Sequence, residues 1–535
     1  MSVSSNVRSS QTARPTSPHT PQQTSSRSTN TSFASTTSAG SSFRNEDDAI
    51  IIEIGARWLR AGFEGSGTPT CTVTFGPEES RRVGDYRGWI SGGTGNGLSQ
   101  QPVDPEDWVR DYEIWRPDVR EMDLGLLEDK IERLFRETFN KYLLTDAGSS
   151  RLVLTLPSLM PHPLLSSLLS TLFSRWRFPN ITLLPSAAMS ATAAGLRSAL
   201  VIDLGWAETT VTGLYEYREV TSKRSTRAMK SLQQEMGRCL DRLASGDELV
   251  ASPEGHISVG FAYCEEILAR IVWCRPHAGG HEDPPTATQK VSIPSPVNPG
   301  EEFIDVPFSR FADPVDTVLL ASGTADGDLD DEEKPIPLLV YHTLLALPPD
   351  ARGICMSRIV FVGGGSRIPG LRKRVLEELS LLIKQYGWSP VRGKALERQR
   401  QRLESMRISS RPPTQAQAQA PPARQNEGSA PDPPKVHSSE EEPEMDFVEQ
   451  KLRRQNKESY VPIHGVVREV ESLGAWAGAS LVTSLKLRGM VEIEREKFLQ
   501  HGLAGASRES EPVVPDRRSG LRAGDRSSWT LAGWA

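Results

Sequence analysis

Cysteine is scarce in this 535-residue sequence, which has five cysteines and no CxxC spacing. An odd number without paired spacing argues against a disulfide framework and a zinc site, and it fits a reducing compartment. The sequence also lacks a run of about 18 apolar residues, so no membrane span is expected. Its polar N-terminus shows no secretory signal.

Apolar residues are few as well, at 37% of the chain. Three segments have too little apolar surface to offset the entropy of ordering, and we predict that they are disordered. They are the Ser/Thr-rich residues 1–46, the Pro- and Gln/Ala-rich insertion 409–450 and the polar tail 507–535. The net charge of −6 gives no sign of a nucleic-acid binder. The length suits two large domains beside these segments.

Between these segments the pattern is α/β. Helical spacing predicts helices over 126–142 and 163–176, and a buried strand over 152–156. Three further apolar runs, at 49–54, 199–204 and 358–362, each meet a glycine turn. Ligands of open α/β sheets bind beyond the carboxyl ends of strands, and glycine lets backbone N–H groups approach a polyphosphate. Each turn alone is more often only a turn, so their order and companions matter.

The three turns together resemble those of the superfamily of actins, sugar kinases and heat-shock chaperone ATPases. The first two are similar to its phosphate hairpins and the third to its adenosine motif. The closest similarity is to actins, because Arg60-Ala61-Gly62-Phe63 sits where actins have a basic residue followed by Ala-Gly-Phe. Residues 473–485 are similar to the actin segment W-x-G-x-S-x-x-x-S-L, and residues 494–498 follow at the actin spacing.

This resemblance implies an actin-like α/β fold in which two ribonuclease-H-like domains flank a nucleotide cleft. The domains would cover 47–198 and 199–408, and 451–506 would return to the first. The resemblance allows ATP or ADP with Mg²⁺ as cofactor, with Glu53 and Asp203 holding the metal through water. The implied cofactor residues are Glu53, Gly55, Arg60, Asp203, Gly205, Thr209, Gly363, Gly364 and Gly365.

The same positions also depart from actins. Ala56 and Arg57 replace a small hydroxyl residue and a glycine, and Arg57 either supplies charge to the phosphates or points into solvent. Trp206-Ala207-Glu208 replaces a small glycine-containing run, and Glu208 would repel phosphate unless it faces outward. Ser186 stands where actins have the glutamine that orients the attacking water. The Lys-Glu pair that cups adenosine in actins aligns with Leu268 and Ala269.

Loss of the residue that positions water should slow hydrolysis greatly, because phosphoryl transfer depends on positioning and electrostatics. We therefore expect a protein that is not an enzyme and has no catalytic residues. Whether its cleft binds nucleotide stays open at this point.

Residues 206–220, 227–232 and 338–345 are similar to divergent fungal actin-related proteins at the pointed end of dynactin. This similarity implies a cytoplasmic, cytoskeletal cap in a hetero-oligomer with a filament-forming actin-related subunit and other pointed-end subunits, serving dynein-driven transport on microtubules. The Gly/Ser-rich loop within 76–108 would no longer support addition of a further subunit. Two alternatives remain, a nuclear subunit of a chromatin-remodelling complex and an active ATPase or sugar kinase.

Overall fold

The computed structural model describes residues 48–76, 103–120, 122–245, 255–277, 289–295, 303–324, 329–388, 465–486 and 492–506. The three segments predicted to be disordered lie outside these residues, and so does most of the Gly/Ser-rich loop. In the described part of the chain, no helix is long and apolar enough to cross a membrane.

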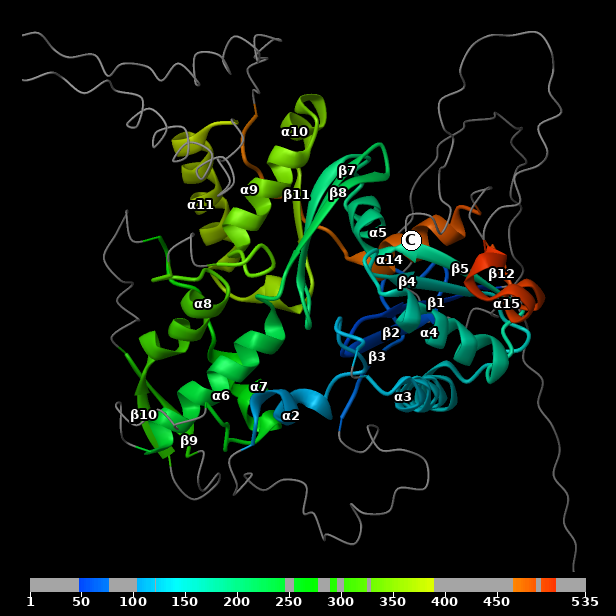
Figure 1. Cartoon of the computed structure of the whole chain (residues 1–535), viewed down its shortest axis with the longest axis horizontal. Helices are drawn as coiled ribbons and strands as arrows, with labels where there is room; N and C mark the ends of the chain where they lie inside the picture. The colour runs from blue at the N-terminus through cyan, green and yellow to red at the C-terminus, as the bar shows by residue number, and fades with distance from the viewer. Residues whose placement is uncertain are drawn as a thin grey trace, which may run out of the picture. The chain divides into compact units, whose positions relative to one another are not determined.

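A six-stranded sheet forms from the first part of the chain and one late strand (Figure 1). Its central strand β1 is almost wholly buried, pairs antiparallel with β2 and parallel with β4, and so explains the apolar run seen in the sequence. The strand order is β12 (Glu492–Glu494), β5 (Asn180–Pro185), β4 (Leu152–Leu156), β1 (Ile50–Ile54), β2 (Trp58–Phe63) and β3 (Cys71–Thr74).

Helices α3 and α4 pack against this sheet and against each other (Figure 1). α3 begins at the N-cap Asp123, whose side chain accepts hydrogen bonds from the amides of Gly125 and Leu126. The bounds of the elements on this side are α3 (Leu124–Glu137), the π-helical turn η1 (Thr138–Leu143), α4 (His162–Ser174), α15 (Arg495–His501) and η6 (Gly502–Ala506).

A second, four-stranded sheet has the order β11 (Ile359–Val362), β6 (Ala199–Leu204), β7 (Thr209–Tyr215) and β8 (Arg218–Ser225). A small hairpin of β9 (Lys290–Pro294) and β10 (Phe303–Pro307) lies apart from it. The surrounding helices are α2 (Pro105–Arg110), α6 (Met229–Ser245), α7 (Phe261–Ile271), η3 (Phe308–Ala312), α8 (Asp313–Val318), α9 (Ile336–Ala346), α10 (Pro349–Met356), η5 (Gly364–Arg367) and α11 (Leu371–Tyr386).

Two helices rich in small residues, α5 (Ser186–Ala193) and α14 (Ala475–Ser484), join the two sheets (Figure 1). Their buried side chains form one core with residues of both sheets, among them Ile51 of β1 and Val201 of β6. Small side chains let these helices approach closely, since each added methylene would hold the backbones apart. The strand ends that carry the glycine turns are therefore fixed relative to one another.

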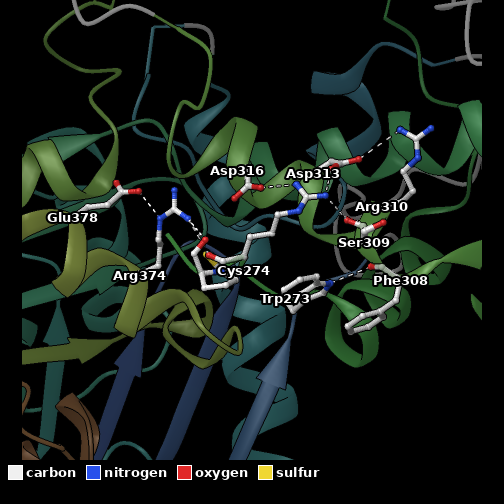
Figure 2. A network of polar contacts seen from close by, with 11 residues as sticks. Trp273, Cys274, Phe308, Ser309, Arg310, Asp313, Asp316, Arg374 and Glu378 are labelled. Carbon is white, nitrogen blue, oxygen red and sulfur yellow. Dashed lines mark hydrogen bonds and ion pairs between the residues drawn. The ribbon is translucent and has the colours of Figure 1, made fainter. Parts of the chain in front are cut away.

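A polar network holds α8 and α11 to the chain that follows α7 (Figure 2). The guanidinium of Arg275 donates to Asp316 and Asp313, each at 2.6 Å, and to the carbonyl of Ser309 at 2.8 Å. Arg374 on α11 donates to the Arg275 carbonyl at 3.2 Å and pairs with Glu378. This network lies in the second-sheet region and supports α7, whose other end faces the glycine turns.

The structure confirms the α/β prediction and the predicted strands and helices, whose ends shift by only a few residues. The π-helical turn η1 ends the first predicted helix region at Leu143. All five cysteines are buried free thiols. Burial raises the pKa of Cys239 to about 11 and that of Cys274 to about 12, which makes these thiols unreactive. The predicted domain boundaries stay a prediction.

Candidate functional site

The three glycine turns meet at the ends of β1, β6 and β11. β6 and β11 are parallel neighbours in which Asp203 pairs with Val362, so the second and third turns leave the sheet side by side. The guanidinium carbon of Arg57 in the first turn lies 4.9 Å from the ring centre of Trp206 in the second, so these two turns lie against each other. The structure thus brings the predicted site residues together.

In the first turn, the carboxylate of Glu53 is occupied by protein groups. One oxygen accepts from Arg60 at 2.7 Å, and the other accepts from the backbone N–H of Trp476 at 3.1 Å, in the first turn of α14. The N–H of Gly55 donates to the carbonyl of Trp58 at 2.9 Å and closes the hairpin. Glu53 therefore links the hairpin to α14, and a negative charge at this helix end is favourable.

The buried position of Arg57 contradicts the expectation that its side chain points into solvent. Its side chain is only 3% exposed, and its Nη2 lies 2.7 Å from both carboxylate oxygens of Glu265 on α7. Its Nη1 donates to the carbonyl of Tyr112 at 2.8 Å. The guanidinium carbon lies 4.7 Å from the ring centre of Phe261 and 4.9 Å from that of Trp206. Its charge is thus already matched inside the protein.

The second turn is built around Trp206. The indole N–H donates to the carboxylate of Glu113 at 3.3 Å, and the ring meets Phe261 edge-on. The hydroxyl of Thr209 donates to the carbonyl of Arg227 at 2.8 Å. A Cβ on Gly205 would lie 2.8 Å from the carbonyl oxygen of Glu208, so the turn is too tight there for another residue.

Glu208 does not face freely outward. Its side chain is 19% exposed, and its carboxylate lies 4.0 Å from Arg224 on β8. Burial raises the pKa of Glu208, and the charge of Arg224 opposes that rise. The carboxylate is therefore retained in a partly buried position by a cation of its own sheet.

The third turn needs its glycines to different degrees. Gly363 has φ of 82°, and a Cβ there would lie 2.4 Å from both the Asp203 carboxylate and the Leu204 carbonyl. At Gly365 a Cβ would lie 2.8 Å from the sulfur of Met229. Gly364 has nothing within 4 Å of its added Cβ. Gly363 therefore serves the packing of β11 on β6, Gly365 leaves room for Met229 at the start of α6, and Gly364 faces open space.

Asp203 lies at the base of the site beside a small pocket that Ser186, Pro157 and Thr210 also line. The space for a solvent molecule in it is about 10 Å³, enough for about one water. Removal from water, followed by the charge of Glu53, raises the pKa of Asp203 to about 6. This carboxyl group costs folding energy whenever it is ionised.

Replacing Asp203 with asparagine should therefore stabilise the chain at neutral pH. Because the pKa is about 6 in the folded chain and about 3.9 unfolded, the cost is absent below about pH 4, grows up to about pH 6 and is complete above it. We expect Asp203→Asn to gain about 1–3 kcal/mol at pH 7.5 and nothing near pH 4, measured by urea unfolding. Asp305→Asn, on the exposed side of β10, is the control. A loss of stability at pH 7.5 would show that the carboxylate has a cationic partner.

The sequence did not point to four of the groups at this site, Tyr112, Glu113, Phe261 and Glu265. Only one feature of the sequence could have indicated that additional groups pack there. Both turns carry a large side chain, Arg57 and Trp206, where small residues are expected, and such a paired change suggests that the two fill the same space. Leu268, aligned with the adenosine-binding pair, is buried in the core of the second-sheet region and presents no charge.

In a comparison with known families, residues 44–258 fit the family model of actin. The matched range contains the first two glycine turns and the strands β1 to β8, and it ends before β11, β12 and the third turn. Together with the two sheets, it shows that this chain has an actin-like fold. Proteins of this fold generally bind a nucleotide with Mg²⁺.

The residues present do not fit that cofactor at the first two turns. Arg57 and Trp206 contact each other where the resemblance places phosphates between the hairpins. Both Glu53 oxygens and the Thr209 hydroxyl are used within the protein. The nearby cations are also matched, in the pairs Arg57–Glu265, Arg60–Glu53, Lys230–Glu113 and Arg224–Glu208. In the described part of the chain, the arginines of the first turn, Arg57 and Arg60, are thus both paired with carboxylates of the protein rather than left for a triphosphate.

Proposed function

We propose that this chain is a non-catalytic structural subunit of an actin-like assembly, and that it caps the pointed end of the dynactin filament. The observation that carries the proposal is the contact between Arg57 and Trp206, which fills the space between the two phosphate hairpins. A chain that has lost its nucleotide chemistry but keeps the fold is suited to a role as a shaped surface. Ser186 supports the same conclusion, because its side chain is too short to hold an attacking water as glutamine does.

The surface proposed to meet the filament is the outer side of α14. This helix is buried almost throughout, yet Leu481 is 46% exposed and Leu485, just after its last residue, is 60% exposed. Residues four apart lie on the same side of a helix, so the two leucines form a continuous apolar stripe. We assign its occupant as an apolar loop of the last filament subunit, an actin-like partner.

The altered side, in this proposal, is the one that contains residues 103–112. The resemblance places this region next to the loop that actins use for adding a further subunit. Here the segment folds back onto its own chain, with Trp108 buried at 7% exposure and its indole N–H donating to the carbonyl of Val259 at 2.8 Å. A segment held in this way is not free to receive another subunit, which supports a terminal position.

The test is affinity purification of the full chain from native extract, comparing wild type with the double variant Leu481→Glu/Leu485→Glu. We expect wild type to recover a filament-forming actin-like subunit with dynein-activator subunits. The variant should recover it at least about tenfold less, since two charges in an apolar interface cost more than about 1.4 kcal/mol. Its melting temperature should stay unchanged, because both side chains are exposed.

Leu499→Glu on α15 is the matched control, because its side chain is 50% exposed and lies on a different helix. It should recover the partner as wild type does. Recovery of a nuclear remodelling ATPase instead would move the chain to the chromatin class. Hydrolysis of saturating Mg-ATP by the purified chain would overturn the non-catalytic assignment.

A further inference from the structure

We infer that Arg57 and the groups around it replace the nucleotide as the tie between the two sheet regions, so that the chain is held closed without any nucleotide. These groups, here called the Arg57 cluster, are Arg57, Tyr112, Trp206, Phe261 and Glu265. The inference rests on the proposed non-catalytic function and goes further, because it states what has taken over the mechanical role of the ligand.

The cluster joins elements that are far apart in the sequence. Arg57 belongs to the β1–β2 hairpin of the six-stranded sheet, and Glu265 and Phe261 belong to α7, which packs beside the four-stranded sheet. Nη2 of Arg57 lies 2.7 Å from both Glu265 oxygens and Nη1 donates to the Tyr112 carbonyl at 2.8 Å, so two nitrogens of the planar guanidinium are fixed by different segments. Tyr112 and Phe261 stack with centres 3.8 Å apart. An arginine so placed is a cross-link between the regions.

The aromatic rings strengthen the tie because they surround the cation. Cations are attracted to ring faces within about 6 Å of the centre, and most strongly when water is excluded. Arg57 meets this distance for Phe261 and Trp206, and its side chain is nearly inaccessible. Trp206 is the residue of the second turn, so both phosphate hairpins contribute to the cluster.

A second layer holds Trp206 in place. Its indole N–H donates to Glu113, which is only 4% exposed as a residue and also pairs with Lys230 of α6 at 3.3 Å. Lys130 of α3 donates to the carbonyl of Glu113 at 2.8 Å. Glu113 thus connects α3, α6 and the second turn, and a buried carboxylate with these partners resists displacement.

A third contact between the regions is the segment 103–112. Val103 and Ile257 exchange backbone hydrogen bonds of 3.0 and 2.9 Å. α2 lies beside α6 and α7 (Figure 1), and Trp108 and Val109 join the core that contains the four-stranded sheet. The chain therefore crosses directly from one region to the other beside the Arg57 cluster, which adds to the closed state.

The experiment combines nucleotide binding with hydrogen exchange on the purified full chain. Mg-ATP and Mg-ADP are the probes, and melting temperature reports binding because a ligand of the folded state raises it with concentration. We expect no concentration-dependent rise for wild type, no co-purified nucleotide, and no change in exchange at 55–57 or 261–265 on adding either probe.

Arg57→Ala tests the tie itself. We expect exchange to become about tenfold faster both at the β1–β2 turn and across α7, because an opening of the cluster exposes both sides together. Arg151→Ala is the matched control, since this arginine lies in the same sheet region, pairs with Glu64 at 3.4 Å and is 38% exposed. It should leave exchange at both places unchanged.

Two results would overturn the inference. The first is binding of Mg-ATP by wild type with new protection from exchange at residues 55–57. It would identify Arg57 as a phosphate ligand instead, because the Nε of Arg57 is buried without a partner and could donate to a phosphate oxygen. Faster exchange at the β1–β2 turn alone in Arg57→Ala would show a local contact and no tie. Either result would leave recovery of filament subunits untouched, so the role as a cap is tested separately from this inference.

Discussion

Replacing Gly478 with alanine is expected to destabilise the chain by about 3–5 kcal/mol, although it exchanges a helix-weakening residue for the best helix former. Helix propensity alone would give a gain of about 1 kcal/mol. The packing of α14 on α5 reverses the sign, because a Cβ at Gly478 would lie 1.9 Å from the carbonyl oxygen of Met189 and 2.7 Å from its carbonyl carbon. These are backbone atoms, which cannot rotate away, so the helices would have to separate.

Urea unfolding of the full chain measures this effect, and the m value should stay constant if only the folded state changes. Gly67→Ala is the control, since a Cβ at Gly67 meets nothing within 4 Å and this residue is exposed and outside any helix. It should change stability by less than about 0.5 kcal/mol. A gain in stability for Gly478→Ala would mean that α5 and α14 are packed less closely than the structure shows.

This helix also shows what could be predicted from sequence. The motif from Trp476 to Leu485 identified the segment, and the structure gives each position a reason. The indole N–H of Trp476 donates to the carbonyl of Ile51 at 3.0 Å, Gly478 admits α5, and the hydroxyl of Ser480 donates to the carbonyl of Ser66 at 2.8 Å. Such positions can be recognised from the sequence because few residue types satisfy each of them, although the groups that they contact lie hundreds of positions away.

The strands that end at glycine turns were predictable for a similar reason. Apolar runs define buried strands, and close approach of β11 to β6 demands Gly363 whatever the rest of the chain does. The roles of the turns did not follow from this. Thr209 and Glu53 occupy the positions that the resemblance assigns to a cofactor, yet they bond to Arg227, Arg60 and the start of α14. A motif fixes the position of a residue on the backbone, and the residues that surround it in space decide what its side chain contacts.

The partners of Arg57 were out of reach for the sequence. Glu265 lies 208 positions further along the chain, and no periodic pattern connects a hairpin turn to the middle of a distant helix. The orientation of Arg57 depends on rings from three segments. The turn alone gave two expectations, that Arg57 points into solvent or that it contacts phosphate, and both omitted the groups that hold its side chain. Two departures from the actin pattern, Arg57 and Trp206, have a common explanation only in the structure, where the two side chains contact each other.

Replacing Arg57 with alanine should lower the free energy of unfolding by about 2–4 kcal/mol. Breaking a fully buried ion pair costs about 3–5 kcal/mol, and the 38% exposure of Glu265 reduces that figure through solvent screening. A double-mutant cycle of Arg57→Ala and Glu265→Ala should give a coupling energy of about 1–2 kcal/mol. Arg57→Lys should recover less than half of the loss, because an ammonium cannot reach both Glu265 oxygens and the Tyr112 carbonyl as the planar fork does.

The control for this cycle is Arg270→Ala with Glu266→Ala, an ion pair on the same helix in which the two side chains are 72% and 59% exposed. Its coupling should not exceed about 0.5 kcal/mol. Equal coupling energies for the two pairs would show that Arg57 behaves as an ordinary surface cation, and the closed cleft would then have to rest on Trp206 and the segment 103–112 alone. A large coupling at Arg57 and a small one at Arg270 would show that Arg57 and Glu265 stabilise each other inside the protein, so that releasing Arg57 to a phosphate group would cost this coupling energy.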